Sequence, residues 1–137
     1  MRQPNLRALF DPESIAIIGA SPDNQKIGGR PLSYLQKYGY EGRIYPINPK
    51  YEEINGLKCF PDIKAVLGDI DLAIIAVPKS VVLETFKKCV EKKVQSVVIF
   101  SAGFAEVDEE GKRQQEEISL IARQNNVSVL GPNCLGM

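Results

Sequence analysis

The sequence contains no histidine among its 137 residues, and this absence has the strongest chemical consequence. Histidine is the side chain that proteins use most often as a general base and as a metal ligand, so both kinds of site lose their usual residue. We therefore expect no catalysis by this chain alone, and we assign no catalytic and no metal-binding residue.

Cysteine is scarce, and its spacing matches no known framework. Cys59, Cys89 and Cys134 are far apart, odd in number and never spaced as C-x-x-C. This pattern argues against a disulfide framework and against a zinc site, and it predicts reduced thiols. We expect Cys89 in the core and Cys59 in a connection. Cys134 has no histidine to activate it as a nucleophile, so we expect a packing or loop role.

An excess of positive or negative charge is also missing. Lys plus Arg and Asp plus Glu each count 17, so no general field attracts nucleic acid or an anionic membrane. No apolar run reaches the length of a transmembrane helix, and residues 1–10 lack the apolar region of a signal peptide. These absences predict a cytoplasmic chain with no nucleic-acid and no membrane partner, in which any recognition of phosphate is local.

The residues that are present fit one domain over residues 1–137, since 44% are hydrophobic and 25% are charged. The β-branched, apolar runs are nearly all continuous rather than alternating, which is typical of strands covered on both faces. These runs are Ser14–Ile18, Arg43–Ile47, Leu72–Val77, Ser96–Phe100 and Val127–Leu130.

Segments with helical spacing separate these runs. They are the stretch from Pro31 to Gly39, a short one from Pro61 to Leu67, the series Val82, Phe86 and Val90, and the stretch with Leu120 and Ile121. Ser80 can cap the third helix, and the acidic turn at residues 108–110 suits the start of the fourth. Strands alternating with helices imply right-handed crossovers. The sequence therefore predicts an α/β fold, a single domain with a doubly wound parallel sheet of about five strands.

Ligands of such sheets bind beyond the carboxyl ends of the strands. The first strand runs into Gly19, and the loop that follows offers hydroxyl and amide donors at Ser21 and Asn24 and the ammonium of Lys26. A tight turn at Gly19 lets backbone N–H groups face a phosphate. The loop departs from the dinucleotide fingerprint G-x-G-x-x-G, because Ser21 stands at the second glycine position. An ordinary strand-to-helix turn is the alternative interpretation.

The second strand ends in Asn48, Pro49 and Lys50, where an NAD-binding protein usually carries an acid for the ribose hydroxyls. An ammonium at this position suits a phosphorylated ribose instead, and coenzyme A and NADP both carry one. A solvated Lys50, with Pro49 simply ending the strand, is the competing interpretation.

Two further loops are expected at the same edge of the sheet. Val77 and Pro78 end the third strand and can form an apolar ledge for an adenine or a pantetheine arm. Ser101, Ala102 and Gly103 follow the fourth strand and can supply hydroxyl and backbone donors. Taken singly, Pro78 is more simply a helix-start proline and Gly103 a loop glycine.

Five segments taken together resemble one family, the N-terminal CoA-binding domain of the NDP-forming acyl-CoA synthetases. They are Ser14–Ser21, Gly42–Lys50, Asp71–Pro78, Val98–Phe104 and Val129–Gly136, so the resemblance spans nearly the whole chain. The chain looks most like the ADP-forming acetyl-CoA synthetase branch, and less like the α subunit of succinyl-CoA synthetase.

The resemblance implies a Rossmann-like fold, coenzyme A or acyl-CoA as the ligand, and the remaining ligase domains or subunits as partners. It implies that the loop from Ser21 to Asn24 lies beside the CoA phosphates or sugar, and that the ammonium of Lys50 pairs with a CoA phosphate. Pro22 lacks an N–H group where the succinyl-type relatives have more glycine, so fewer phosphate contacts are expected there. The candidate cofactor-binding residues are Gly19, Ala20, Ser21, Pro22, Asn24, Lys26, Asn48, Lys50, Val77, Pro78, Ser101, Ala102 and Gly103.

In that family, acyl-CoA formation runs through an acyl phosphate and a phosphorylated histidine in later domains, together with an ATP-grasp domain. The resemblance therefore implies a CoA-binding module of an acetate–CoA ligase that performs no chemistry alone. Two alternatives stay open: the CoA-binding portion of a protein acetyltransferase, and an NAD(P)-responsive regulatory domain, for which the Gly19 turn serves equally well. A homodimer that buries apolar surface is also possible.

Overall fold

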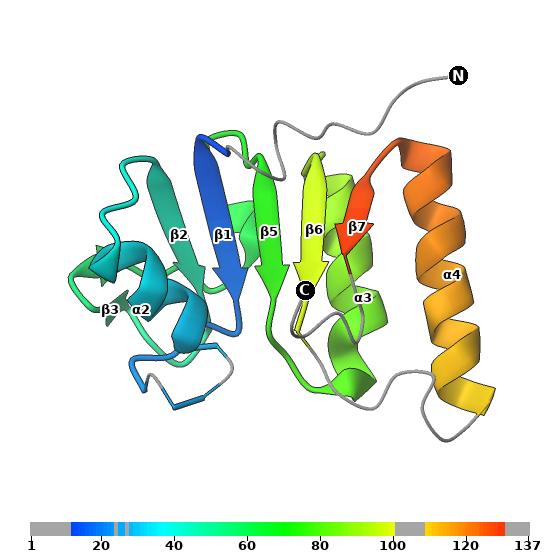
Figure 1. Ribbon diagram of the computed structural model, residues 1–137, viewed down its shortest axis with the longest axis horizontal. Helices are drawn as coiled ribbons and strands as arrows, with labels where there is room; N and C mark the ends of the chain where they lie inside the picture. Colours follow the sequence, from blue (N-terminus) through cyan, green and yellow to red (C-terminus); the bar gives the residue numbers. More distant parts are fainter. Residues whose placement is uncertain (1–11, 24, 27, 101–108, 131–137) are drawn as a thin grey trace.

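The computed structural model describes residues 12–23, 25, 26, 28–100 and 109–130. Within them, five strands form one parallel sheet in the order β2-β1-β5-β6-β7 (Figure 1). The strands are β1 (Ser14–Ile18), β2 (Arg43–Ile47), β5 (Leu72–Ile75), β6 (Ser96–Ile99) and β7 (Ser128–Leu130). This arrangement confirms the predicted fold class.

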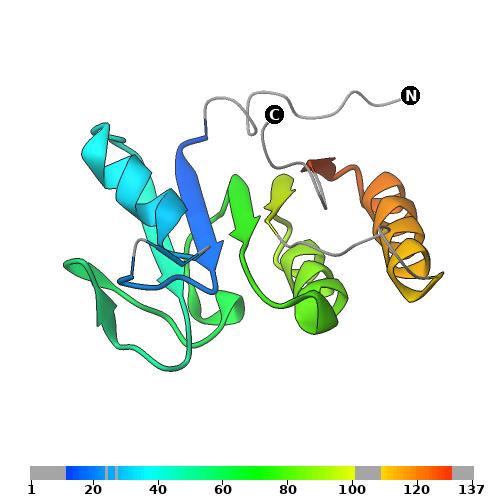
Figure 2. The same ribbon diagram turned by 60° about the horizontal axis from the view of Figure 1, so that its bottom comes forward.

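Helices cover both faces of this sheet. Helix α2 (Arg30–Lys37) lies on one face, and α3 (Lys79–Glu91) and α4 (Glu109–Asn125) lie on the other (Figures 1 and 2). Successive strand residues point to opposite faces, so Ile15 and Ile17 of β1 pack with Leu32 of α2, whereas Ala16 joins the core beside Phe86 of α3. This two-sided burial explains why the strands are continuously apolar. No helix within the described ranges is long and apolar enough to cross a membrane.

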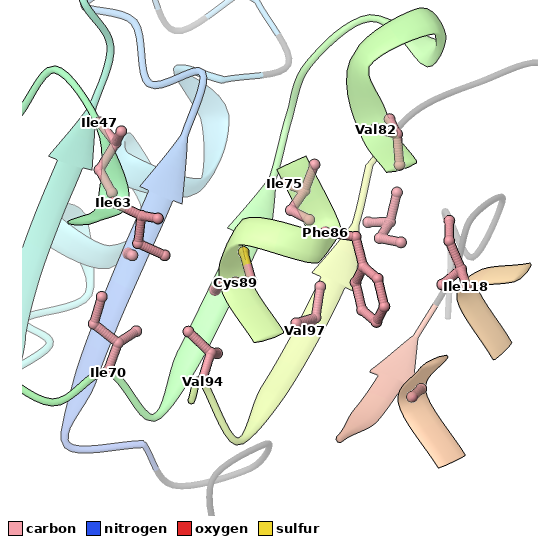
Figure 3. Packing of buried hydrophobic residues seen from close by; sticks show 14 of the residues in the cluster. Ile47, Ile63, Ile70, Ile75, Val82, Phe86, Cys89, Val94, Val97 and Ile118 are labelled. Atoms are coloured by element: carbon pink, nitrogen blue, oxygen red, sulfur yellow. The ribbon is translucent and has the colours of Figure 1, made fainter. Parts of the chain in front are cut away.

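The larger of the two cores lies between the sheet and the pair α3 and α4. Figure 3 shows Phe86 of α3 between the strand residue Val97 and the α4 residue Ile118, and Val82 and Cys89 of the same helix belong to the same cluster. All five side chains are fully buried or nearly so. The prediction that Cys89 belongs to the core is confirmed.

Two details of the predicted helices are wrong, at Ser80 and between Pro61 and Leu67, and the outer position of Leu120 was not predicted. Pro78 is the N-cap residue of α3, so Ser80 lies inside the helix and does not cap it. Leu120 is 47% exposed, because Ile118 and Ala122, one turn apart, form the buried stripe of α4 and leave Leu120 on the outer side. Between Pro61 and Leu67 only the three residues of η1 (Ile63–Ala65) are helical, as a 3₁₀ turn.

A small antiparallel hairpin follows β2 and was not predicted. It consists of β3 (Glu53–Ile54) and β4 (Leu57–Lys58), joined by Asn55 and Gly56 with φ of 51° and 83°. Asn-Gly is the commonest sequence for such a two-residue turn, because both positions need positive φ. The hairpin returns the chain to β2, where Phe60 forms a parallel bridge with Ile47. It thereby brings the next residues to the carboxyl edge of the sheet.

Candidate ligand-binding cleft

A cleft of about 970 Å³ lies at the carboxyl ends of β1, β2 and β5, the edge that Figure 2 brings forward. The chain crosses from β2 at one side of β1 to β5 at the other, so this is the switch point of the sheet, where ligands of open α/β folds bind. The lining residues are Ile18, Gly19, Ser21, Gln25, Lys26, Gly28, Ile47, Asn48, Pro49, Lys50, Tyr51, Pro61, Asp62, Ile63, Ala76, Val77, Pro78, Thr85 and Lys88.

Most of the candidate residues that the structure describes meet in this cleft. The ones that line it are Gly19, Ser21, Lys26, Asn48, Lys50, Val77 and Pro78. Ala20 is fully buried and Pro22 is exposed, and neither residue is part of the lining. The candidates Asn24, Ser101, Ala102 and Gly103 and the cysteine Cys134 lie outside the described residues.

Glycine is required at two positions of the first loop by close approach of the backbone. Gly19 has a φ of +88°, and a Cβ atom there would lie 2.2 Å from the carbonyl oxygen of Ala76. A Cβ atom on Gly28 would lie 1.8 Å from the carbonyl oxygen of Gly19. The loop therefore packs against β5 and against itself with no room for a side chain at either position.

The backbone N–H groups at the start of this loop are already used within the protein. Those of Gly19 and Ala20 donate to the Ile47 carbonyl at 2.9 and 3.3 Å, and that of Ser21 donates to the Gly28 carbonyl at 3.3 Å. The expectation that a phosphate faces these amides is therefore wrong for these three, because the loop folds onto the end of β2 and closes on itself. At Gly19, Ala20 and Ser21, contact with an anion is therefore left to side chains.

Asn48 connects the two loops that border the cleft. Its Nδ2 donates to the Ala20 carbonyl at 2.9 Å, and its Oδ1 accepts the Lys50 backbone N–H at 2.9 Å. The amide thus fixes the backbone of Lys50 relative to the first loop. Asn48 therefore positions the backbone of Lys50, whose side chain is exposed and lines the cleft.

The charges of the described lining fall into two groups. Lys26 and Lys50 are exposed ammonium groups without an ion pair to any described carboxylate. Lys88 and Asp62 instead pair at 3.2 Å. The Lys64 backbone N–H and then Lys88 lower the pKa of Asp62, and Asp62 in turn raises the pKa of Lys88, so both stay charged at neutral pH. The surplus is positive and lies at the Lys26 and Lys50 end, which suits an anionic ligand.

Sequence reasoning missed one wall of the cleft. Asp62 follows the β3–β4 hairpin in the chain. The Asn55-Gly56 pair indicates this hairpin in the sequence. Thr85 and Lys88 are three residues apart on α3, so they share one helix face. That spacing is visible in the sequence, but only the tertiary fold turns this face toward Asp62.

The rest of the described chain offers little other chemistry. No group of three or more histidine, cysteine or acidic side chains is placed to hold a metal ion within it. Cys59 and Cys89 are both buried, and burial raises the pKa of Cys89 to about 12. At neutral pH this thiol is therefore protonated and a poor nucleophile.

A comparison with protein families decides the relationship. The family described as CoA binding domain matches residues 13–137. The chain belongs to this family. Coenzyme A is accordingly its cofactor, and the positively charged cleft at the carboxyl edge of the sheet is chemically compatible with a ligand that carries three phosphate groups.

Individual relatives of this CoA-binding domain are parts of acyl-CoA ligases. The α subunit of acetate–CoA ligase (ADP-forming) II from Pyrococcus furiosus is 44% identical over 94% of this chain, which covers 28% of that subunit. A trans-feruloyl-CoA synthase from an unknown prokaryotic organism is 40% identical over 93% of the chain, which covers 18% of the synthase.

A solved structure shows the same fold. The dinucleotide-forming acetyl-coenzyme A synthetase 1 of Candidatus Korarchaeum cryptofilum, in complex with phosphate and ADP, matches with a TM-score of 0.88 and 40% identity. The match covers 96% of this chain and 28% of that protein. The chain therefore spans less than a third of the length of each of these relatives.

Proposed function

We propose that this domain binds coenzyme A in the cleft at the carboxyl edge of the sheet, as the CoA-binding part of an ADP-forming acyl-CoA ligase. The observation that carries the proposal is the pair of ammonium groups, Lys26 and Lys50, on two loops that Asn48 holds together. Coenzyme A carries a 3′-phosphate and a diphosphate on one ribose, so two cations on neighbouring loops match its charge distribution.

Lys50 is the proposed reader of the 3′-phosphate, since it stands where the second strand ends and where an unphosphorylated ribose is usually met by an acid. Lys26, on the loop after β1, then lies on the side of the diphosphate. Apolar lining from Val77 and Pro78 is available to the uncharged parts of the ligand. The assignment of these residues to CoA is the part of the proposal that binding measurements test.

The test is calorimetry of the purified chain with CoA, dephospho-CoA and NADP. An exposed ammonium–phosphate pair contributes on the order of 1 kcal/mol, so Lys50→Ala is expected to weaken CoA binding about fivefold and dephospho-CoA binding little. Lys112→Ala, on α4 and outside the cleft lining, is the matched control and should leave both affinities unchanged.

Three outcomes would contradict parts of the proposal. Equal affinity of the unmodified chain for CoA and dephospho-CoA would remove Lys50 as the reader of the 3′-phosphate. Absence of any CoA binding would end the proposal for this domain in isolation. Tighter binding of NADP than of CoA would favour the NAD(P)-responsive alternative.

The reaction partners are assigned to the rest of the ligase. Relatives named for acetate and for ferulate share this domain at 44% and 40% identity, so we place selection of the acyl group outside it. The proposed partners are the remaining ligase domains or subunits. Sedimentation of the purified chain tests the homodimer, and the sequence adjoining this domain in its gene separates a ligase from a protein acetyltransferase.

A further inference from the structure

One wall of the cleft has no role in the proposal above. It is formed by Pro61, Asp62 and Ile63 before and within η1 and by Thr85 and Lys88 on α3, and we call it the η1–α3 wall. Its polar groups come from two elements that pack together, and the Asp62–Lys88 pair at 3.2 Å joins them. The wall is therefore a built surface rather than a chance grouping of side chains on one loop.

The η1–α3 wall offers hydrogen bonds without net charge. Asp62 accepts the Lys64 backbone N–H at 3.0 Å with Oδ1 and the Lys88 ammonium at 3.2 Å with Oδ2. A carboxylate has about four acceptor positions and an ammonium three donors, so both groups retain hydrogen-bonding capacity toward the cleft. Asp62 is about one-third exposed, with a relative side-chain accessibility of 38%. Such a wall favours an uncharged ligand group that both donates and accepts, and it disfavours a phosphate.

Backbone hydrogen bonds also join the segment that leads to Lys50 to the segment that leads to this wall. The Asn48 backbone N–H donates to the Phe60 carbonyl at 2.9 Å, and the Phe60 N–H donates to Pro46 at 2.9 Å. Lys50 follows Asn48 by two residues, and Asp62 follows Phe60 by two residues. Lys50 and Asp62 thus each follow by two residues one of the two segments that this backbone pairing holds side by side.

Two uncharged parts of CoA can be considered for this wall. The adenine is attached to the ribose that carries both phosphate groups, whereas the pantetheine arm begins beyond the diphosphate. A group that lies close to the 3′-phosphate is therefore the adenine. Its amino group is a donor for the carboxylate, its ring nitrogens are acceptors for Lys88 or Thr85, and Ile63 and Pro61 supply apolar contact to its plane.

We propose that Asp62, held in place by Lys88, selects adenine by accepting a hydrogen bond from its exocyclic amino group. This inference rests on the proposed CoA site and adds the specificity residue of its base. The base hypoxanthine, in which an oxygen replaces the amino group, presents an acceptor to the carboxylate and is rejected. Lys88 orients the carboxylate and cancels its repulsion toward the nearby phosphates.

The experiment compares adenosine 3′,5′-bisphosphate with inosine 3′,5′-bisphosphate, which keep the 3′-phosphate and the first 5′-phosphate of CoA but lack its second 5′-phosphate and the pantetheine arm. Calorimetry of the unmodified chain should show adenine preferred about tenfold, the value of one hydrogen bond to a charged group. In Asp62→Asn the amide can present either a donor or an acceptor and can still cap η1, so the preference should fall to about twofold or less.

Two variants of α3 serve as a matched pair. Lys88→Met should reduce the preference for adenine, because the carboxylate loses its partner. Lys87→Met removes the neighbouring ammonium, which pairs with Glu117 outside the cleft lining, and should leave the preference unchanged. Circular dichroism of each variant confirms that the fold is retained.

The failure of this inference is distinct from the failure of the CoA site. Binding of CoA with an adenine preference that is the same in Asp62→Asn overturns the role of Asp62 and leaves the site standing. An effect of Asp62→Asn on CoA that is absent for adenosine 3′,5′-bisphosphate would assign the wall to the part of CoA beyond the first 5′-phosphate and overturn the inference. If neither CoA nor the bisphosphates bind, the proposed function itself has failed.

Discussion

At the scale of single residues, Gly19 is constrained by two independent features of the fold. Its φ is +88°, and the Ala76 carbonyl occupies the place of a side chain. Gly39 shares only the first feature, since its φ is +72° and nothing lies within 4 Å of the Cβ position. The two glycines therefore allow backbone strain and steric clash to be measured separately.

Gly19→Ala is expected to destabilise the protein by about 3 kcal/mol or more, because about 1 kcal/mol comes from the left-handed backbone and the rest from displacement of the loop against β5. Gly39→Ala should cost only about 1 kcal/mol. Urea denaturation of both variants measures the difference. Equal losses would show that the contact with Ala76 relaxes at no cost and that the loop is not held by it.

At the scale of elements, the β3–β4 hairpin carries Asp62 to the cleft and depends on a short turn. Asn55 and Gly56 both have positive φ, and nothing lies within 4 Å of a Cβ atom on Gly56. Gly56→Ala therefore acts through backbone strain alone. It should weaken the turn by about 1 kcal/mol without touching the core.

The expected result of Gly56→Ala is faster opening of the hairpin alone. The amides of Cys59 and Phe60, which donate to Glu52 and Pro46, should exchange with solvent about fivefold faster, as 1 kcal/mol implies. Amides of β5 should be unchanged. Hydrogen exchange read by mass spectrometry checks both regions, and equal acceleration in β5 would mean that the hairpin is part of one cooperative unit with the sheet.

The elements also show what the sequence could and could not predict. The bounds of β1 and β2 agree with the prediction because both strands are apolar runs closed by turn residues, whereas β5 ends two residues early, at Ile75, since the chain turns toward Pro78 and α3. The hairpin has strands of two residues, too short for any periodicity, and only its Asn-Gly turn marks it.

The candidate site was predictable to the extent that the parallel sheet dictated it. Loops after β1, β2 and β5 meet at one edge in any such sheet, which is why Lys26, Lys50 and Val77 line one cleft. Asp62 and Lys88 belong to elements joined only by tertiary packing, so spacing alone did not connect them. The N–H groups of Gly19 and Ala20 likewise donate to the Ile47 carbonyl, a tertiary contact that no local sequence pattern reveals.

At the scale of the whole molecule, the stability of the larger core depends on pH through Cys89. The pKa of this buried thiol is raised by desolvation from 9.0 to about 12. A folded-state pKa above the unfolded value means that the folded form is favoured fully below about pH 9 and loses this contribution as the pH rises toward 12.

Cys89→Ala should remove this alkaline sensitivity. The unmodified protein is expected to lose about 1.4 kcal/mol of stability per pH unit above pH 9 through this thiol, and the variant should lose less by that amount. Urea denaturation near pH 8 and pH 10 gives the loss of stability of each protein between the two pH values. Subtracting the loss of the variant from that of the unmodified protein cancels the titration of other groups. Parallel pH dependence in both proteins would show that Cys89 reaches solvent before the core unfolds.

The outer margin of β2 has a consequence for how copies of this protein meet one another. Pro46 has no N–H group, and its carbonyl already accepts the Phe60 N–H. The Phe60 carbonyl in turn accepts the Asn48 N–H. At Pro46, an incoming extended segment would find no donor and a carbonyl that is already engaged. The same backbone bridge that assembles the cleft therefore obstructs strand-by-strand growth into fibrous aggregates at the carboxyl end of β2.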